Sequence, residues 1–205
     1  YPTQFPKNVI EVMKNSFKIC KYLDIPFQHI SDKVLVQMRR GHSKQEAYDL
    51  IADLRANIPD MALRTTLMVG HPGEDEEAFN ELLEFIKQVR FERLGVFAYS
   101  EEDGTYGAKN LKDAISDKEK QHRADAVMKL QSRISGELNQ EKVGKTFRVI
   151  IDRKEGEFFI GRTQYDSPEV DGEVLIKSEN SIEIGGFYEV VITSSDDYDL
   201  LAELA

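Results

Sequence analysis

The sequence predicts an α/β fold joined to a small all-β module, because the residue pattern changes partway along the chain. Up to about residue 142, short β-like runs alternate with helix-length amphipathic stretches, as in βα units around a parallel sheet. After Gly144, β-branched and aromatic runs recur about 10–15 residues apart, with turns rich in Asp, Gly and Asn between them. We therefore expect part of a TIM-like α/β barrel over residues 1–142 and a small OB-like barrel over residues 143–205.

In the first part, hydrophobic periodicity and helix-end signals place the elements. Expected strands are 22–27, 62–69 and 94–99, and expected helices are 7–17, 31–40, one opening at residue 43, one ending near residue 90, and 116–140. The string Ser43-Lys44-Gln45-Glu46 is a capping box. We expect Phe17 and Leu83 to face the core, Gly41 to stop the second helix, and residues 100–108 to form a loop.

The second part reads as strands with little helix. The expected strands are 146–151, 157–163, 172–175 and 187–192, with a weaker candidate at 199–204. Four or five short antiparallel strands of this kind suggest a small Greek-key barrel of OB-like character.

Acidic charge is concentrated in the second part. The whole chain carries a net charge of −10, and residues 143–205 hold fourteen Asp and Glu against six Lys and Arg, a net of −8. Such a surface repels phosphate backbones, so nucleic acid is an unfavourable partner, and it attracts basic partners. A surface that only keeps the protein soluble fits the same charge.

Composition excludes several classes. No run approaches 18 apolar residues, so no membrane span is expected, and the first residues do not resemble a signal peptide. The single cysteine, Cys20, excludes an internal disulfide and a cysteine-built metal site within the chain; we expect it to be a small buried hydrophobe. No metal ligands are predicted, and the cytoplasm is the expected location. Walker, Gly-x-Gly-x-x-Gly and Gly-x-Ser-x-Gly motifs are absent.

Two strand ends carry residues that could bind a ligand. The turn 69–74 follows the strand 62–69, and Gln28 and His29 follow the strand 22–27. Ligands of α/β barrels bind at the carboxyl ends of the strands, and Gly70 and Gly73 would let a backbone approach closely. A tight βα turn and a hydrogen-bonded structural histidine explain the same residues, and the pattern alone does not decide between these interpretations.

Longer strings carry a family resemblance. The string YLDIPFQH at residues 22–29 and MRRG at 38–41 resemble a signature of radical S-adenosylmethionine (radical SAM) methylthiotransferases. The strings LRTTLMVGHPGE at 63–74 and LGVFAYS at 94–100, followed by Gly104-Thr105, resemble two further segments of that family. Residues 143–205 resemble its TRAM domain. The Arg64-Thr65-Thr66 string and the opening Tyr1-Pro2-Thr3 are similar to the RimO-type branch.

The resemblance implies a fold, a reaction and a set of cofactor contacts. It implies part of a radical SAM barrel over 1–142, and a reaction that adds a methylthio group to the β-carbon of an aspartate in a small-subunit ribosomal protein. S-adenosylmethionine and two 4Fe-4S clusters are the implied cofactors of the full-length protein. The residues expected to contact S-adenosylmethionine are Gln28, His29, Arg64, Gly70, Pro72, Gly73, Glu74 and Phe97.

A basic ribosomal protein also suits the acidic second part. The acids expected to contact it are Asp166, Glu169, Asp171, Glu173, Asp196, Asp197 and Asp199. We take this charge to favour the protein-modifying branch over the sister branch, which modifies adenosine in transfer RNA.

One feature of the family is missing from the sequence. Its members hold a cluster through a Cys-x-x-x-Cys-x-x-Cys loop, and one cysteine outside such a motif cannot supply it. We therefore expect a C-terminal fragment that lacks the cluster ligands and is inactive alone. A naturally truncated, non-enzymatic interaction module stays open as an alternative.

Overall fold

The computed structural model describes residues 2–3, 5–178 and 181–205, so Tyr1 of the opening string lies outside the described residues. The chain forms two compact units. The first consists of Tyr1–Phe17 and Leu23–Gln131, and the second of Lys18–Tyr22 and Ser132–Ala205. The long helix α6, Asp117–Gln140, contributes to both.

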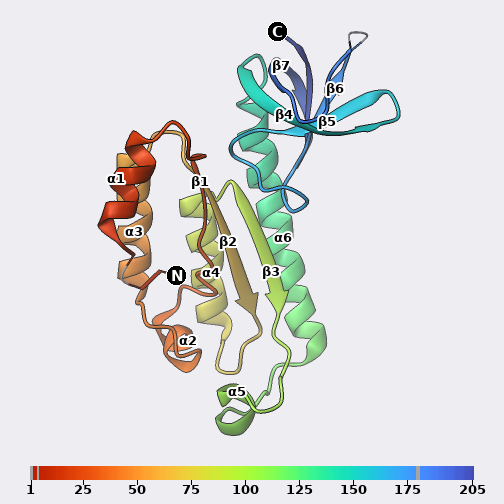
Figure 1. Ribbon diagram of the computed structural model, residues 1–205. Helices are drawn as coiled ribbons and strands as arrows, with labels where there is room; N and C mark the ends of the chain where they lie inside the picture. The colour runs from red at the N-terminus through yellow and green to blue at the C-terminus, as the bar shows by residue number, and fades with distance from the viewer. Residues whose placement is uncertain (1, 4, 179–180) are drawn as a thin grey trace. The chain divides into compact units, whose positions relative to one another are not determined.

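The first unit is an α/β fold, as predicted. Its elements are α1 (Lys7–Asn15), β1 (Tyr22–Asp24), α2 (Asp32–Gln37), α3 (Lys44–Asn57), β2 (Ala62–Val69), α4 (Glu76–Val89), β3 (Arg93–Ala98), α5 (Tyr106–Asn110) and the start of α6 (Figure 1). The strands form one sheet in the order β1-β2-β3. The α/β class is confirmed, and its TIM-like part stays a prediction.

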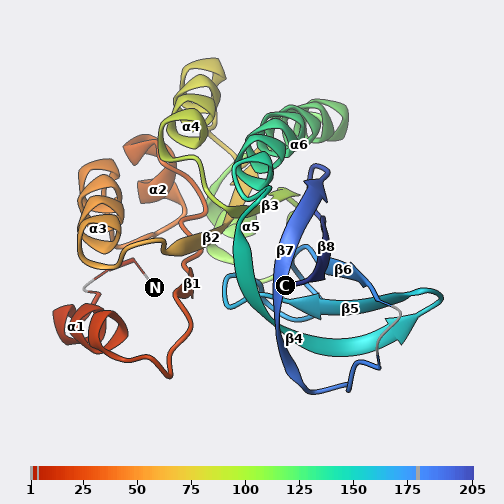
Figure 2. The same ribbon diagram turned by 90° about the horizontal axis from the view of Figure 1, so that it is seen from above.

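Strands β2 and β3 pair in parallel, with Arg64 opposite Arg93 and Val69 opposite Ala98. Along β2, residues 63, 65, 67 and 69 are buried while the alternate residues 64, 66 and 68 are only partly covered. Helices α3 and α4 lie on one side of this sheet (Figure 2), which explains the alternation, because successive strand residues face opposite sides. Both strands therefore end at the same edge.

Aromatic packing fills the core of the first unit. Phe27, Phe85 and Phe91 are fully buried. The ring centroids of Phe85 and Phe91 are 5.4 Å apart, and those of Phe27 and Phe85 are 6.0 Å apart, both edge to face. Phe85 takes the core position that we expected for Leu83, which is only half-buried. Leu83 and Phe85 are two residues apart on α4 and so lie on different faces of the helix. Phe85, the larger apolar side chain, is on the buried face.

The first strand ends earlier than predicted, at Asp24, because Pro26 has no N–H to continue the ladder. At this point the buried hydroxyl of Thr65 replaces the backbone pairing between the strands. It donates to the carbonyl of Ile25 (2.8 Å) and accepts from the amide of Phe27 (3.3 Å). Backbone pairing resumes at Gln28, whose amide donates to the Thr66 carbonyl (3.0 Å). The segment therefore still follows β2 to the sheet edge.

Helix ends account for the other corrections in this unit. Helix α1 stops at Asn15, so Phe17 is 92% exposed instead of buried. The stop of α2 is Arg39 and not Gly41: Arg39 has φ 56°, and the Arg40 amide donates to the Leu35 carbonyl (2.9 Å). These are features of a Schellman motif with arginine in the left-handed position. The capping box at Ser43 is confirmed.

The loop predicted over residues 100–108 contains the start of a short helix, α5. The Thr105 hydroxyl accepts a hydrogen bond from the Ala108 amide (3.3 Å), which caps it. Five residues are too few for hydrophobic periodicity to reveal such a helix. Cys20, expected to be buried, is exposed.

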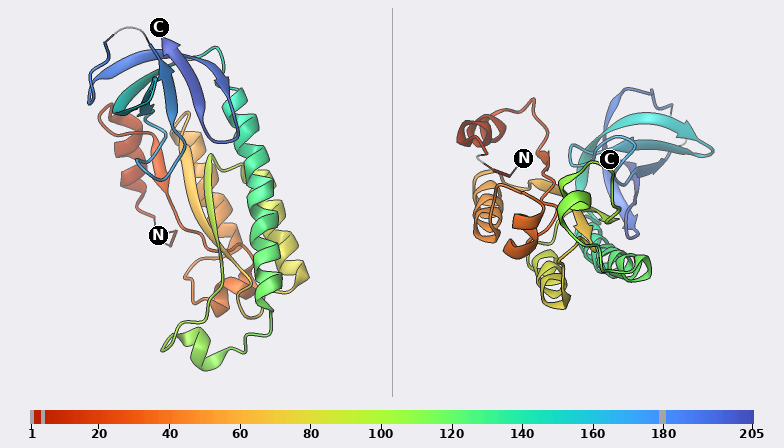
Figure 3. Two further views of the ribbon diagram at one scale, coloured as in Figure 1. Left: turned by 90° about the vertical axis from the view of Figure 1, so that its right-hand side faces the viewer. Right: turned by 90° about the horizontal axis from the view of Figure 1, so that it is seen from below.

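The second unit is a closed five-stranded barrel (Figure 3). Its strands are β4 (Thr146–Glu155), β5 (Phe158–Arg162), β6 (Val174–Lys177), β7 (Phe187–Ser195) and β8 (Leu200–Leu204), in the order β4-β5-β6-β8-β7. The five predicted strands are confirmed, and the fully antiparallel pairing is wrong, since β6 and β8 are parallel. A closed ring with an odd number of strands cannot alternate direction throughout, so one parallel pair is required.

The inward residues of the barrel form one apolar core. Its buried members are Val149, Ile151, Phe159, Val174, Ile176, Ile182, Val190, Ile192, Leu200 and Ala202. Elsewhere, no helix within the described residues has the apolar length needed to cross a bilayer.

The close approach of β4 and β5 depends on Gly161. A Cβ at this position would lie 2.4 Å from the Ile150 carbonyl oxygen, which is backbone and cannot move aside. We expect Gly161→Ala to destabilise the barrel by about 3 kcal/mol, as overpacking does in other cores. Urea unfolding followed by far-UV circular dichroism measures this.

Gly95→Ala on β3 is the control, because its Cβ would meet only Arg64 Nη2, at 3.9 Å. It should leave stability unchanged or slightly higher. Equal unfolding midpoints for both variants would contradict the close approach of β4 and β5 at Gly161.

Candidate functional site

The carboxyl ends of the three strand segments meet at one edge of the sheet. The Met68 amide donates to the Gln28 carbonyl (2.7 Å), and the Tyr99 amide donates to the Val69 carbonyl (2.8 Å). These bonds place Gln28, the turn after Val69 and Tyr99 next to one another. The predicted grouping of the first two strand ends is therefore present in the first unit.

A pocket of about 320 Å³ opens at this edge, and we call it the strand-end pocket. It is lined by Gln28, Gln37, Met38, Arg40, Met68, His71, Tyr99, Ser100, Glu102, Thr105, Tyr106 and Gly107. Two polar atoms among them, Tyr99 Oη and Gln37 Oε1, are buried with no hydrogen-bond partner in the described part of the chain. Burying a polar atom unpaired costs about 1–3 kcal/mol, so a site that leaves two of them is suited to a polar ligand.

His71 contributes a neutral imidazole to the pocket. Its Nδ1 lies 2.9 Å from the Pro72 carbonyl oxygen, and because a carbonyl only accepts, Nδ1 carries the proton. Burial lowers the pKa of His71, which keeps the ring uncharged at neutral pH. Nε2 is then an acceptor.

Behind the turn lies a buried charged group that we call the Glu74 cluster: Glu74, Arg123, His29 and the Gly70 amide. Arg123 Nη1 donates to Glu74 Oε1 (2.7 Å), and the Gly70 amide donates to Oε2 (2.9 Å). His29 Nε2 lies 3.4 Å from Oε2, an electrostatic contact too long for a strong hydrogen bond. Burial alone would raise the pKa of Glu74, but the contacts with His29, Arg123 and Gly70 outweigh it, and the pKa is lowered.

The tautomer of His29 follows from its other nitrogen. The Ser31 amide donates to His29 Nδ1 (3.0 Å), so Nδ1 keeps its lone pair. The proton of the neutral ring is therefore on Nε2, which faces Glu74. His29 is fully buried and contacts Glu74 without lining the strand-end pocket.

The two glycines of the turn are needed for the chain's own side chains. A Cβ on Gly70 would lie 2.3 Å from Lys120 Cγ, and one on Gly73 would lie 2.0 Å from Gln37 Oε1. Both also have positive φ, 73° and 90°. Their first role is to let α6 and α2 pack against the turn.

The remaining residues expected to contact the cofactor lie elsewhere on the same sheet or turn. Pro72 is buried in the turn. Arg64 pairs with Asp24 (Nη1 to Oδ2, 2.6 Å), and Phe97 is 63% exposed; neither lines the strand-end pocket. Sequence reasoning missed Gln37, His71, Tyr99 and Arg123 as candidates. His71 and Tyr99 stood within the resembling strings, whereas Arg123 left no local signal.

The acids expected to contact a partner lie in the second unit, and most are bonded within it. Asp166 is buried and accepts from the Thr163 hydroxyl (2.6 Å), and Asp171 accepts from the Ser167 amide (2.8 Å) and the Tyr22 hydroxyl (2.8 Å). Glu169, between them, is exposed and has φ 64°. The loop 166–171 is thus shaped by its two aspartates.

The other acids follow the same pattern. Glu173 pairs with Arg153 (2.6 Å), and Asp199 accepts from the Glu173 amide (2.8 Å). Asp196 accepts from the amides of residues 198 and 199, and Asp197 accepts from the Ser132 hydroxyl. Asp196 and Asp199 thus bind backbone amides and Glu173 and Asp197 bind side chains, so all four carboxylates are engaged within the second unit.

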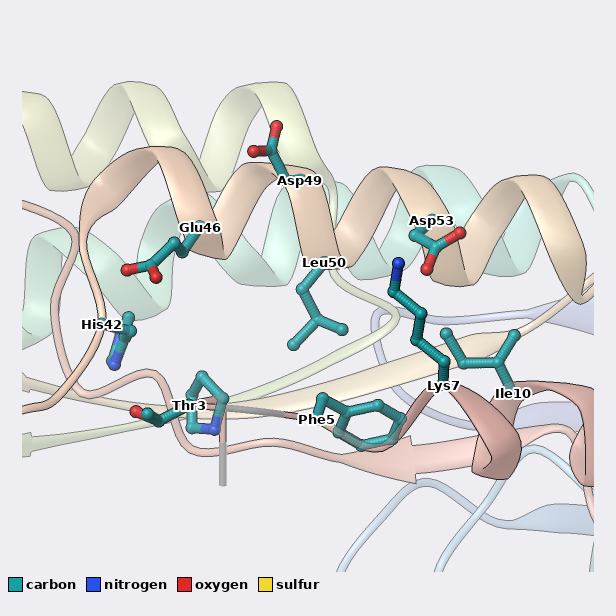
Figure 4. Close-up of a pocket in the computed structure, with 10 residues that line it drawn as sticks. Thr3, Phe5, Lys7, Ile10, His42, Glu46, Asp49, Leu50 and Asp53 are labelled. Carbon is teal, nitrogen blue, oxygen red and sulfur yellow. The ribbon is translucent and has the colours of Figure 1, made fainter.

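A second hollow, of about 400 Å³, lies between α1 and α3 (Figure 4). His42 lines it, and both ring nitrogens of this buried histidine are without a hydrogen-bond partner among residues 2–3, 5–178 and 181–205. Asp49 and Asp53 of α3 and Lys7 of α1 lie along it. It is separate in its lining from the strand-end pocket.

No three His, Cys, Asp or Glu side chains within the described ranges are placed to hold a metal ion together. The single cysteine of the sequence cannot anchor an iron–sulfur cluster, which takes several thiolates. The residues present do not fit such a cluster.

Comparison with known proteins defines the class. The family model described as "Radical SAM superfamily" matches residues 2–86, and the one described as "TRAM domain" matches residues 143–205. The chain therefore combines a radical SAM segment with a TRAM domain.

Curated relatives narrow the class further. Over 205 residues, all of this chain and 48% of the relative, it is 58% identical to "Ribosomal protein uS12 methylthiotransferase RimO" of Phocaeicola vulgatus. Proteins of the same name from Bacteroides thetaiotaomicron and Christiangramia forsetii are both 52% identical, over 100% and 99% of this chain and 47% and 45% of the relatives. The chain is thus similar over its whole length to proteins named RimO, and it spans about half the length of these relatives.

The Glu74 cluster predicts a pH-dependent stability. Because the folded state lowers the pKa of Glu74, the ionised carboxylate stabilises the fold above its usual pKa of about 4.3, and this contribution is lost as the pH falls through the lowered value. We expect Glu74→Gln to cost about 2 kcal/mol at pH 7, with a smaller difference from wild type below about pH 4. Urea unfolding at a series of pH values measures this.

Glu81→Gln is the matched control, since Glu81 pairs with Lys44 on the surface of the same unit. It should cost under about 1 kcal/mol. A cost for Glu74→Gln at pH 7 that is no larger than that of the control would contradict the buried ion pair.

Proposed function

We propose that this chain forms part of a radical SAM methylthiotransferase that modifies the β-carbon of an aspartate in the small-subunit ribosomal protein uS12. The observation that carries the proposal is the identity of 58% over the whole chain with a relative named for that reaction. The strand-end pocket supports it from the structure, since it lies at the carboxyl edge of the sheet, where α/β folds bind ligands.

The strand-end pocket fits S-adenosylmethionine by its size and its polar atoms. Its volume of about 320 Å³ falls in the range of small-molecule sites. Tyr99 Oη can donate to a ligand, and Gln37 Oε1 and His71 Nε2 can accept. When bound, S-adenosylmethionine supplies the radical and methyl chemistry, while the protein orients it and excludes water.

Different residues of the chain would contact the cofactor and support those contacts. We propose that Gln28 and the turn of Gly70, Pro72 and Gly73 contact the cofactor, and that the Glu74 cluster with His29 supports them from behind. Arg64 and Phe97 lie outside the lining of the strand-end pocket, and we propose cofactor contacts for them from the family resemblance alone.

The family resemblance also implies iron–sulfur clusters, whose ligands must be located. Because the residues of this chain do not fit a cluster, we propose that the ligands of two 4Fe-4S clusters lie in the part of the relatives that this chain does not span. We also propose a functional boundary between residues 142 and 143, which the start of the TRAM match supports.

For the second unit we propose a docking role toward the basic ribosomal protein. The acids from Asp166 to Asp199 named above would contribute through their negative charge, and Glu169, Glu189 and Glu203 are exposed acids with no ion pair or side-chain hydrogen bond within the described residues. A field of unneutralised carboxylates steers a basic partner mainly through the association rate.

Ligand binding tests the pocket. We expect Tyr99→Phe and Gln37→Leu each to weaken binding of S-adenosylmethionine about 3- to 10-fold, the worth of one hydrogen bond. Equilibrium dialysis against the 205-residue chain measures the Kd. Tyr48→Phe is the control, because the Tyr48 hydroxyl bonds to Gln88 (3.0 Å) and Tyr48 does not line the pocket. Wild-type affinity in both pocket variants would place the cofactor elsewhere.

Charge reversal tests the docking role. Changing Glu169, Glu189 and Glu203 together to Lys should slow association with isolated uS12 at least about tenfold at low salt, and less at physiological salt. Surface plasmon resonance measures both rates.

The control makes the same change in net charge on the first unit, at the exposed acids Asp60, Glu77 and Glu101. If both triple variants associate with uS12 equally fast, the acidic barrel is not the docking surface.

A further inference from the structure

Arg123 is the one cation that holds both the side chain and the backbone of Glu74 in the described part of the chain. Its Nη1 donates to Glu74 Oε1 (2.7 Å) and to the Glu74 carbonyl (3.0 Å). The arginine is itself fixed, since its Nε donates to Glu119 one turn earlier on α6 (2.9 Å) and its guanidinium lies 5.2 Å from the Phe79 ring. Helix α6 thereby sets the position of residue 74.

Glu74 in turn holds the start of the turn by hydrogen bonds. Its carboxylate accepts from the Gly70 amide (2.9 Å), and its own amide donates to the His71 carbonyl (2.9 Å). The residues between these bonds include His71, which lines the strand-end pocket. Displacing Glu74 would therefore move the wall of the pocket.

The same carboxylate also faces the other strand end. His29 Nε2 lies 3.4 Å from Oε2, and the neighbouring Gln28 lines the pocket with φ 69°. A non-glycine residue holds such a conformation only where its surroundings fix it. One buried carboxylate thus connects the two segments that form this side of the pocket.

We propose that Arg123 is a positioning residue, which holds Glu74 so that the turn Gly70–Glu74 and the Gln28–His29 segment keep the strand-end pocket ready for its ligand. This inference rests on the proposed function, which supplies the ligand. Arg123 does not line the pocket and acts through Glu74. Its effect is on affinity, beyond any effect on stability.

The experiment compares Arg123→Met and Arg123→Lys with Lys44→Met, which breaks the surface pair with Glu81 in the same unit. Three quantities are measured on the full chain: the Kd for S-adenosylmethionine, the hydrogen exchange rate of the Gly70 amide by NMR, and the Tm. Arg123→Met should raise the Kd at least about tenfold and speed Gly70 exchange at least about tenfold, in line with the loss of one charged hydrogen-bond network.

The conservative variant separates positioning from folding. Arg123→Lys keeps the charge, and we expect it to recover part of the affinity and of the Gly70 protection, whereas Lys44→Met should leave both at wild-type values. If Arg123→Met does not fold, Arg123→Lys and Glu74→Gln decide, each expected to raise the Kd and the exchange rate together.

Failures of the two proposals look different. Wild-type Kd and Gly70 exchange in the Arg123 variants, with S-adenosylmethionine binding intact, overturns the positioning role and leaves the proposed function standing. No binding by wild type overturns the use of the pocket by S-adenosylmethionine. The positioning role is then decided by Gly70 exchange alone, which supports it if faster in Arg123→Met and overturns it if unchanged.

Discussion

The buried carboxylate of Glu74 is the constraint around which the sheet edge is organised. A carboxylate removed from water must be paired with cations and donors, and here three elements supply them: α6 through Arg123, the segment after β1 through His29, and the turn itself through the Gly70 amide. Any arrangement that separates these elements leaves an unpaired charge. The carboxylate therefore specifies one relative position of two strand ends and a helix, although hydrophobic packing alone tolerates many.

The local signals of the sequence predicted most elements of the fold. The predicted buried strand over 62–69 is β2 to the residue, and the capping box at Ser43 opens α3 as expected, because the signals for both lie within a few residues along the chain. Errors arose at a helix end and in the pairing of distant strands. The stop of α2 is Arg39 in the left-handed conformation and not the expected Gly41, and the parallel pairing of β6 with β8 follows from closing five strands into a ring.

Only the site residues that lie within sequence motifs could be predicted. Strand-end residues such as Gln28 and the turn at Gly70 could be expected from the pattern, and the pocket does form beside them. Arg123 lies 49 residues from Glu74 along the chain, and its helix-face position matches an ordinary solvated cation until the fold brings it to the turn. The acids of the barrel were predicted to contact a partner because of their number and charge. The sequence did not reveal that Asp166 and Asp171 form hydrogen bonds within their own loop.

The order of strands in the barrel bears on how the second unit folds. Strand β8 follows β7 in sequence but lies between β6 and β7, so β6 gains its second neighbour only when β8 arrives. Its pairing with β6 joins residues 174 and 200, a contact that is distant in sequence and entropically costly to form early. The hairpin of β4 and β5 can form first from local contacts, whereas closure waits for the last strand of the barrel. During synthesis, the barrel core stays open to solvent and to chaperones until β8 has emerged.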